Sequence, residues 1–279
     1  MPELADRQQV RALGHRAAAA LRAAGGRTTP LPDFPDAPYA MAAGEIIWIG
    51  QSGAMHPRAV FCDHRGQPAS HRQLWIADLV PWSAPAFELD AAAVARLHAG
   101  LSKLAASLAA RPAARGFAPL LASHSLEFPL QARRAAALAL GRAARADDPL
   151  AFTNAALRLL GLGSGLTPSG DDYVGGALFA LRAIHPRQRA WQTAATGICA
   201  LAASRTHAIS AALLSDLASG DSFAALHALL AGAAAGLEPA ALAATVDQLT
   251  AIGHSSGWDM LTGLLAASAG LPEDHHAST

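Results

Sequence analysis

The chain has 279 residues, of which 52% are hydrophobic and 15% are charged, with 21 basic residues against 21 acidic ones. The length allows a sizeable core in one large domain or two smaller ones. The balanced charge predicts no binding of nucleic acid or of an anionic membrane surface, and every apolar run is interrupted before it reaches the length of a membrane span. Cys62 and Cys199 have no metal-ligand spacing, which favours free thiols and a cytoplasmic protein.

Residues 1–85 are expected to form a small N-terminal α/β portion. An Ala-rich amphipathic pattern predicts a helix over residues 4–24, closed by Gly25-Gly26, and a proline-rich connector follows over residues 29–38. Three short runs rich in β-branched and aromatic residues then predict strands. These runs cover residues 45–49, 59–62 and 74–80.

Residues 86–279 are expected to be entirely helical. A stripe of apolar residues at alternating spacings of three and four begins near residue 90 and is typical of a helix packed on a neighbour. Its members are Val94, Leu97, Leu101, Leu104 and Leu108. Glycines and prolines divide the remainder into short helices, and residues 112–129 form its least regular part. The predicted fold class is therefore α+β, with a β-containing portion followed by a larger helical domain.

The densest sequence pattern lies at residues 159–178, which hold six glycines, one Thr-Pro-Ser and the acids Asp171 and Asp172. It predicts a helix, a tight loop and a second helix that runs to about Ile184. Ser169 with Asp172 three residues later has the form of a capping box. Loop amides and helix N-terminal amides form natural anion sites. Capping alone would explain Ser169 and Asp172, but it leaves Asp171, Thr167 and the glycines unexplained.

The run Gly-Leu-Gly-Ser-Gly-Leu-Thr-Pro-Ser-Gly-Asp-Asp at residues 161–172 resembles the motif of the AllH-like family. Residues 253–263 (Gly-His-Ser-Ser-Gly-Trp-Asp-Met-Leu-Thr-Gly) are similar to the C-terminal motif of that family, and residues 206–210 resemble a weaker third block. The family was long labelled a domain of unknown function and includes a subunit of oxamate carbamoyltransferase from anaerobic allantoin breakdown. The resemblance implies a transferase subunit of purine catabolism with partner subunits.

The second motif repeats the first after 87 residues. Ser169-Gly170-x-Asp172 and a glycine four residues later correspond to Ser256-Gly257-x-Asp259 and Gly263. The repeat would be explained if the two helices are simply capped by the same residue pattern. The alternative, which we favour, is that the two turns lie side by side and aim both helix N-termini into one cleft that holds a phosphate or carboxylate.

Two functions are weighed. The first is an enzyme or enzyme subunit that binds a small anionic substrate, by resemblance for carbamoyl transfer between phosphate and oxamate or a related acyl-phosphate or carboxylate reaction. The second is a non-catalytic ligand-binding or assembly subunit of a multisubunit enzyme. Activity of the purified chain alone, against activity only with its neighbours, separates them.

The candidate site residues come from the motifs. The candidate catalytic residues are Asp171, Asp172 and His207. The two aspartates would hold Mg²⁺, the only cofactor expected, or serve as acid–base groups, and His207 would neutralise the anion together with Arg205. The remaining candidates would bind the ligand through amides, hydroxyls and one cation. They are Gly163, Ser164, Gly165, Thr167, Ser169, Gly170, Arg205, Thr206, Ser210, Ser256, Gly257 and Asp259. Because Asp171 is not needed for the cap, we expect it to matter more to function than to stability.

Overall fold

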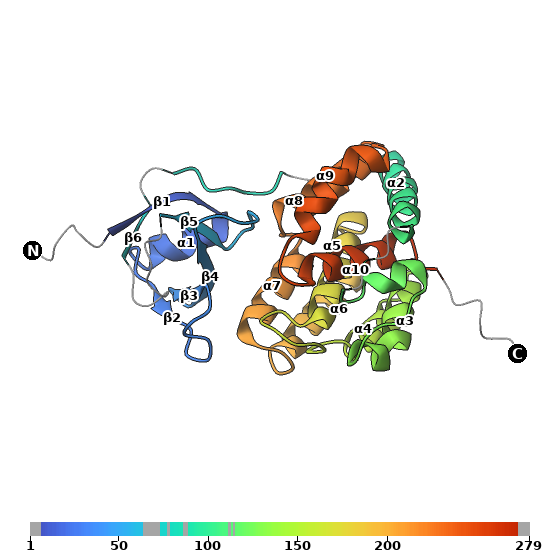
Figure 1. Ribbon diagram of the computed structural model, residues 1–279, viewed down its shortest axis with the longest axis horizontal. Coiled ribbons are helices and arrows are strands. Elements are labelled where there is room, and N and C mark those ends of the chain that lie inside the picture. Colours follow the sequence, from blue (N-terminus) through green and yellow to red (C-terminus); the bar gives the residue numbers. More distant parts are fainter. Residues whose placement is uncertain are drawn as a thin grey trace, which may run out of the picture. The chain divides into compact units, whose positions relative to one another are not determined.

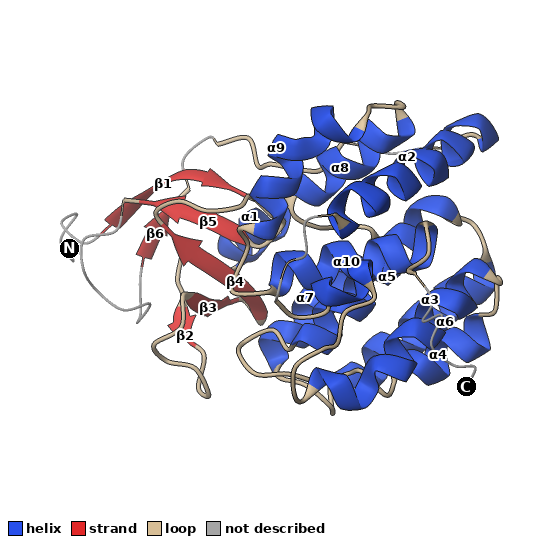
Figure 2. Ribbon diagram, turned by 45° about the vertical axis from the view of Figure 1, so that its right-hand side comes forward, coloured by secondary structure: helices blue, strands red, loops and turns tan. Residues whose placement is uncertain are grey.

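The computed structural model describes residues 7–63, 73–76, 79–85, 89–110, 113 and 115–272. The chain divides into two compact units, Met1–Pro85 and Ala86–Thr279. The described strands all lie in the first unit, and the second is helical, which confirms the predicted α+β class (Figures 1 and 2). No helix among the described residues is long and apolar enough to cross a bilayer.

The first unit is a six-stranded sheet with one helix packed on it, and the strand order is β2-β3-β4-β5-β1-β6. The pairs β1–β6 and β4–β5 are parallel, and the other neighbours are antiparallel. The strands are β1 (Arg7–Leu13), β2 (Thr29–Pro30), β3 (Tyr39–Ala42), β4 (Glu45–Gly50), β5 (Ala59–Cys62) and β6 (Gln73–Trp75). Helix α1 (His15–Ala23) buries Ala17, Ala18, Ala20 and Leu21 in the same core as Ile47 and Val60.

The predicted helix over residues 4–24 is wrong in its first half. Residues 4–6 lie outside the described chain, and β1 occupies the place of the first two helical turns, so α1 begins only at His15. Val10 and Leu13 are buried, and β1 pairs with a strand on each side. Sheet pairing on both edges therefore outweighs the helical propensity of an Ala-rich segment.

The three predicted strands correspond to β4, β5 and β6. The last is shorter than expected, because β6 ends at Trp75, and residues 77–78 of that prediction lie outside the described chain. Strands β2 and β3 were not predicted. β2 contains only two residues, and β3 alternates half-buried and buried positions over just four.

The second unit has nine α-helices among its described residues, together with 3₁₀ turns at Ala118–Ala122 and Leu130–Arg133. They are α2 (Ala91–Ala109), α3 (Arg134–Arg145), α4 (Pro149–Ala156), α5 (Ser169–Ile184), α6 (Arg189–Ala202), α7 (Ala208–Ser219), α8 (Ala224–Ala234), α9 (Pro239–Thr250) and α10 (Ser256–Ser268). The predicted stripe on α2 buries its four leucines in the shared core.

Helix α5 forms the centre of this unit. Every residue from Ser169 to Leu181 is buried, which is more than one face of a surface helix provides. Helix α10 lies beside it (Figures 1 and 2) and is buried almost as completely, from Gly257 to Ser268 apart from Trp258. The two helices that carry the glycine–acid motifs are therefore the core pair of the helical unit.

Because the second unit has a core of its own, we expect residues 86–279 to fold without the first 85 residues. The large apolar cluster around α5 and α10 draws on side chains of this unit alone. Circular dichroism and urea unfolding of the fragment should give native helicity and a cooperative transition. A fragment that lacks a cooperative transition would contradict two independent domains.

Candidate functional site

The two Ser-Gly-x-Asp turns lie side by side at the start of α5 and α10. The hydroxyl oxygens of Thr167 and Ser256 are 2.8 Å apart, and those of Ser169 and Ser255 are 3.3 Å apart. Each pair joins one turn to the other. The predicted adjacency of the two turns, 87 residues apart in sequence, is therefore confirmed.

Glycines at equivalent positions hold the two helices together. A Cβ on Gly176 would lie 2.0 Å from the carbonyl oxygen of Met260, and one on Gly263 would lie 1.9 Å from that of Tyr173. Met260 follows Tyr173 by 87 residues, as Gly263 follows Gly176, so the contacts are reciprocal. Only glycine allows this approach of backbone to backbone.

The predicted capping boxes are wrong. The N-cap of α5 is Pro168, the N-cap of α10 is Ser255, and neither helix has a side-chain cap hydrogen bond. The side chains of Ser169 and Ser256 point across to the other turn, which is why they do not cap their own helices. The repeated pattern encodes a shared polar cluster rather than two independent caps.

Six residues make up this cluster, called here the twin-acid cluster. They are Asp172 and Asp259 with Thr167, Ser169, Ser255 and Ser256. Asp172 is 5% exposed and Asp259 is 0% exposed. The Oδ2 atom of each is buried without a hydrogen-bond partner. Unpaired buried carboxylate oxygens are costly, so this pair requires a physical explanation.

The hydroxyls serve the two acids reciprocally. Hydrogen bonds from Ser256 and Thr167 act on Asp172, and hydrogen bonds from Ser169 and Ser255 act on Asp259. Each acid thus lies beside one hydroxyl of its own turn and one of the other turn. The two hydroxyls of a pair also bond to each other and each has one hydrogen, so one of the two donates to the acid. Ser169 and Ser256, which are 87 residues apart, follow the same relation as the glycine contacts, whereas Thr167 and Ser255 are not equivalent positions of the repeat.

Burial dominates the electrostatics of the cluster. Burial raises the pKa of Asp259 to about 7, against opposing hydrogen bonds from the Phe117 N–H and from Ser169 and Ser255. Burial and then the charge of Asp259 raise the pKa of Asp172 well above its ordinary value. Two adjacent buried carboxylates cannot both remain charged cheaply.

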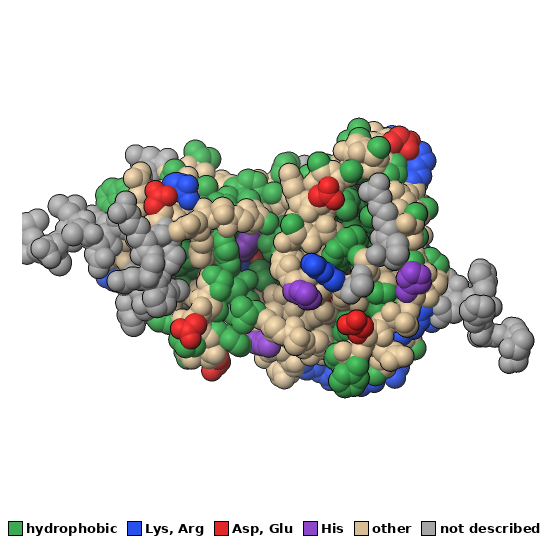
Figure 3. Space-filling model, in the orientation of Figure 1, with side chains coloured by type: hydrophobic (Ala, Val, Ile, Leu, Met, Phe, Trp, Pro, Cys, Tyr) green, Lys and Arg blue, Asp and Glu red, His purple; other side chains and the backbone are tan. Residues whose placement is uncertain are grey.

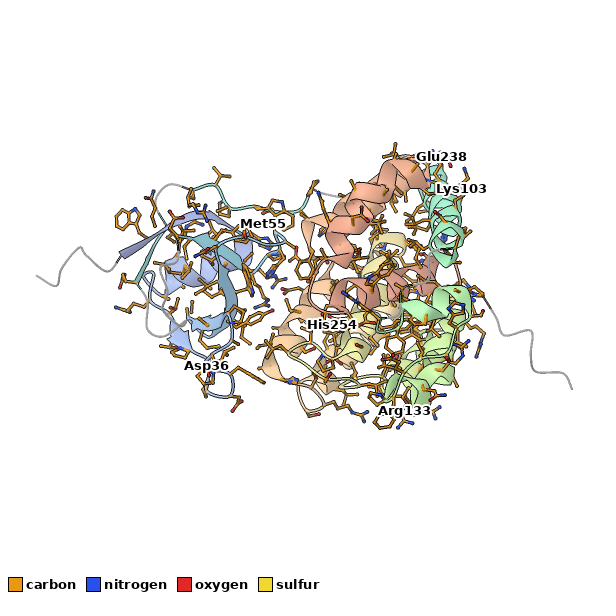
Figure 4. The ribbon with its side chains drawn as sticks, in the orientation of Figure 1. Asp36, Met55, Lys103, Arg133, Glu238 and His254 are labelled. Atoms are coloured by element: carbon orange, nitrogen blue, oxygen red, sulfur yellow. The ribbon has the colours of Figure 1, made fainter. Side chains whose placement is uncertain are left out.

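A segment far away in sequence covers Asp259. The Phe117 N–H donates to Asp259 Oδ1 at 2.6 Å, and a Cβ on Gly116 would lie 2.0 Å from the same oxygen. Arg115 donates to the His254 carbonyl oxygen at 3.4 Å. His254 is exposed on the loop before α10, as labelled in Figure 4, and Figure 3 shows a histidine beside a basic side chain on this face. Arg115 therefore places one guanidinium group at the surface next to the cluster.

Asp171 belongs to a different cluster, although it neighbours Asp172. It is 2% exposed, and its Oδ1 accepts the Gly161 N–H at 2.7 Å. Its Oδ2 accepts the hydroxyls of Thr206 at 2.5 Å and Ser210 at 2.7 Å. Asp171 therefore ties the glycine loop to the start of α7, and the expectation that it matters more to function than to stability stays a prediction.

The remaining polar candidates lie on or near the loops. Arg205 is exposed and donates to the Leu157 carbonyl oxygen at 2.7 Å, and His207 Nε2 is 3.0 Å from the carbonyl oxygen of Gly165. Ser164 and Gly165 are exposed, and Gly163 and Gly165 have φ angles of +117° and +98°. The structure therefore places these residues beside the Asp171 cluster.

Two amides that we expected to bind an anion already have partners. The Gly170 N–H donates to the Leu162 carbonyl oxygen at 2.8 Å, and the Gly257 N–H donates to the Ile252 carbonyl oxygen at 3.1 Å. Both glycines are buried against their own loops, where a Cβ would strike a backbone carbonyl within 2 Å. Their absent side chains allow the loop to close and do not by themselves provide a ligand site.

The expected magnesium ligands are not brought together. Three donors occupy Asp171, whereas Asp172 faces the twin-acid cluster, so the two carboxylates do not point at one cation. Among the described residues, no group of three or more His, Cys, Asp or Glu side chains could hold a metal ion. Magnesium binding at Asp171 and Asp172 stays a prediction. Carboxylates with hydroxyls, as in the twin-acid cluster, suit only hard cations.

Sequence reasoning missed three contributors to the site. Ser255 lies in the second motif, but no role was predicted for it. Arg115 and Phe117 lie in residues 112–129, which have no regular pattern. A second serine beside an expected N-cap was the available signal for Ser255. No local signal identifies Phe117, because its role depends on a backbone N–H placed by tertiary structure.

A separate pocket lies at the other end of α5. It has a volume of about 610 Å³ and lies between α5, α6 and α7. Its lining combines apolar side chains with Arg182, His185, Gln192, Thr196 and Cys199. None of the candidate site residues lines it, so this pocket is separate from the clusters around Asp171, Asp172 and Asp259.

Residues 159–268 match the family model of the oxamate carbamoyltransferase subunit AllH. The resemblance to the AllH family is confirmed. The matched segment begins at the first glycine motif and ends with α10, so it contains both turns and both halves of the twin-acid cluster. No curated protein and no solved structure matches the chain. The AllH-like segment thus contains all six residues of the twin-acid cluster.

Proposed function

We propose that the chain is a subunit of a carbamoyltransferase-like enzyme and that its small anionic substrate binds at the surface of the two turns. The observation that supports this most is that two distant motifs of the AllH-like segment build one buried polar cluster. A pure packing module needs no such cluster, because apolar residues would fill the crossing at lower cost. A cytoplasmic location and a role in allantoin breakdown belong to the same proposal, in agreement with two free cysteines.

The reaction sets clear requirements. When oxamate and carbamoyl phosphate react, the amide nitrogen forms a bond to the carbamoyl carbon and loses a proton, while the carbon–oxygen bond to phosphate breaks. The reverse direction returns a proton to the leaving nitrogen. A site for this chemistry needs cations for the phosphate and carboxylate groups, and a group that exchanges one proton. Arg115 supplies a cation, His254 and His207 supply imidazole groups beside the loops, and the twin-acid cluster supplies the acids.

Thermal unfolding with candidate ligands tests the binding. We expect oxamate, phosphate or carbamoyl phosphate to raise the melting temperature of the full chain by several degrees, since about 100 times Kd contributes about 2.7 kcal/mol. Ser256→Ala should reduce that rise. The matched control is Ser102→Ala, because Ser102 is exposed on α2 and donates to the His98 carbonyl oxygen. An equal rise in both variants would argue against binding at the turns.

One observation favours the second function, a non-catalytic ligand-binding or assembly subunit. The Gly170 and Gly257 amides are already paired, so an anion would have to compete with existing hydrogen bonds. An assembly subunit would show no thermal response to these ligands alone, yet would be required for transfer when partner subunits are added. Transfer by the purified chain alone would exclude this alternative.

A further inference from the structure

The unpaired carboxylate oxygens are the feature that the proposed function does not explain. Asp172 Oδ2 and Asp259 Oδ2 are both buried, and neither has a hydrogen-bond partner. The donors described in the cluster are the Phe117 N–H, which donates to Asp259 Oδ1, and the hydroxyls of the two turns. A proton held between the two acids would supply the donor that each Oδ2 lacks.

We propose that Asp172 and Asp259 act as one proton-sharing pair, which the hydroxyls of Thr167, Ser255 and Ser256 connect to the surface. This inference rests on the proposed function for its role in the transfer. The pair gives its proton to the leaving nitrogen in one direction and takes it back in the other. Each hydroxyl passes the proton on by donating its own hydrogen while accepting one from the acid behind it.

The depth of each group supports this path. Asp172 and Asp259 are buried, whereas Thr167, Ser255 and Ser256 are half-buried and reach the solvent side of the turns. The Thr167 and Ser256 hydroxyls, 2.8 Å apart, are at ordinary hydrogen-bonding distance. A substrate at the surface therefore contacts a hydroxyl, and the acids act one hydrogen bond further in.

The groups around Asp172 and Asp259 favour a state in which the two acids share one proton over a state in which both carboxylates are charged. Helix α5 adds the neighbouring carboxylate of Asp171, whose charge raises the pKa of Asp172 further. Helix α5 also carries Tyr173, whose hydroxyl donates to the Ala137 carbonyl oxygen instead of to the acids. The covering segment and the loop before α10 bring Arg115 and His254, whose described contact is with each other.

The pH dependence of stability has a definite sign. An acid whose pKa is raised on folding stabilises the folded state fully at pH values below its ordinary pKa. That stabilisation is lost as the pH rises to the pKa of the acid in the folded state. With the pKa of Asp259 at about 7, the loss falls between about pH 4 and pH 7. Asn at this position keeps a hydrogen-bond donor without needing a proton.

The test measures the melting temperature of the full chain at pH 5 and pH 8 in EDTA. We expect the wild type to melt several degrees lower at pH 8, and we expect Asp172→Asn and Asp259→Asn to lose most of that difference. Asp247→Asn is the control, since it changes an exposed acid on α9 outside the pair and should keep the difference. If the two variants show the full wild-type difference, the pair shares no proton.

A cation is the competing explanation, and the same experiment separates it. Millimolar Mg²⁺ or Ca²⁺ that stabilises the wild type at pH 8 but not Asp259→Asn would make the pair a cation site and overturn the proposal. If neither ion has this effect, the shared proton is supported.

Transfer in the assembled enzyme tests the catalytic role. Asp259→Asn should lower the rate by about 100-fold or more, the usual effect of losing an acid–base group, and should flatten the pH–rate profile. If Asp259→Asn keeps the transfer rate but loses the difference in melting temperature between pH 5 and pH 8, the shared proton is only structural. That outcome would overturn the proposed proton transfer to the substrate. If the wild type with its partners transfers nothing, the proposed function fails, while the stability measurement still decides whether the proton is shared.

Discussion

Gly263→Ala is expected to lower the free energy of unfolding of the helical unit by about 3 kcal/mol. The added Cβ would lie 1.9 Å from the carbonyl oxygen of Tyr173, and a backbone atom at the centre of α5 cannot move aside as a side chain can. For a unit of this size the melting temperature should fall by roughly 6–12 °C. Urea unfolding followed by circular dichroism measures the change.

Gly197→Ala is the matched control for this prediction. Gly197 also lies inside a helix, α6, but nothing lies within 4 Å of its added Cβ. Alanine should therefore stabilise α6 by about 0.5–1 kcal/mol through helix propensity. Gly176→Ala should behave like Gly263→Ala, because its contact is the reciprocal one. Similar stability of the Gly197 and Gly263 variants would mean that the helices are not in such close contact.

Asp171→Asn is expected to lower the free energy of unfolding by about 3 kcal/mol. The carboxylate accepts one backbone N–H and two hydroxyls, and hydrogen bonds to a charged group contribute about 1.5–3 kcal/mol each. An amide can accept on one oxygen only and turns its own donor toward one of these three. Asp247→Asn, on the exposed surface of α9, should stay within about 0.5 kcal/mol of the wild type.

This result would decide between two interpretations of Asp171. The sequence suggested an acid that matters more to function than to stability, whereas the structure shows a buried acceptor that joins two loops. If Asp171→Asn is as stable as the wild type but the assembled enzyme loses transfer, Asp171 matters more to function than to stability. Measuring both quantities on one preparation is therefore essential.

Local sequence predicted the helical unit well because its signals are local. Glycines with positive φ and the prolines end helices through their own backbone geometry, and the leucine stripe on α2 records burial on one face. In the first unit the opposite holds. Strand β1 consists of residues with a helical pattern and is a strand only because β5 and β6 pair with it.

The site could be predicted only in part for a similar reason. The 87-residue repeat predicted that the two turns meet, and the structure confirms this contact. The repeat could not show where each side chain points. Asp171 and Asp172 are adjacent in sequence, yet the turn of the helix sends them into separate clusters, and Ser169 and Ser256 point across the crossing instead of capping.

The reciprocal glycine contacts also limit how the molecule can move. At Gly176 and at Gly263, a backbone carbonyl of the partner helix occupies the place where a side chain would otherwise lie. Neither helix can therefore slide or rotate without a collision between backbones. Asp172 and Asp259 therefore keep a fixed position relative to each other, because each lies in the first turn of one of the two interlocked helices. The backbone at Gly116 and Phe117 contacts Asp259 from outside this crossing.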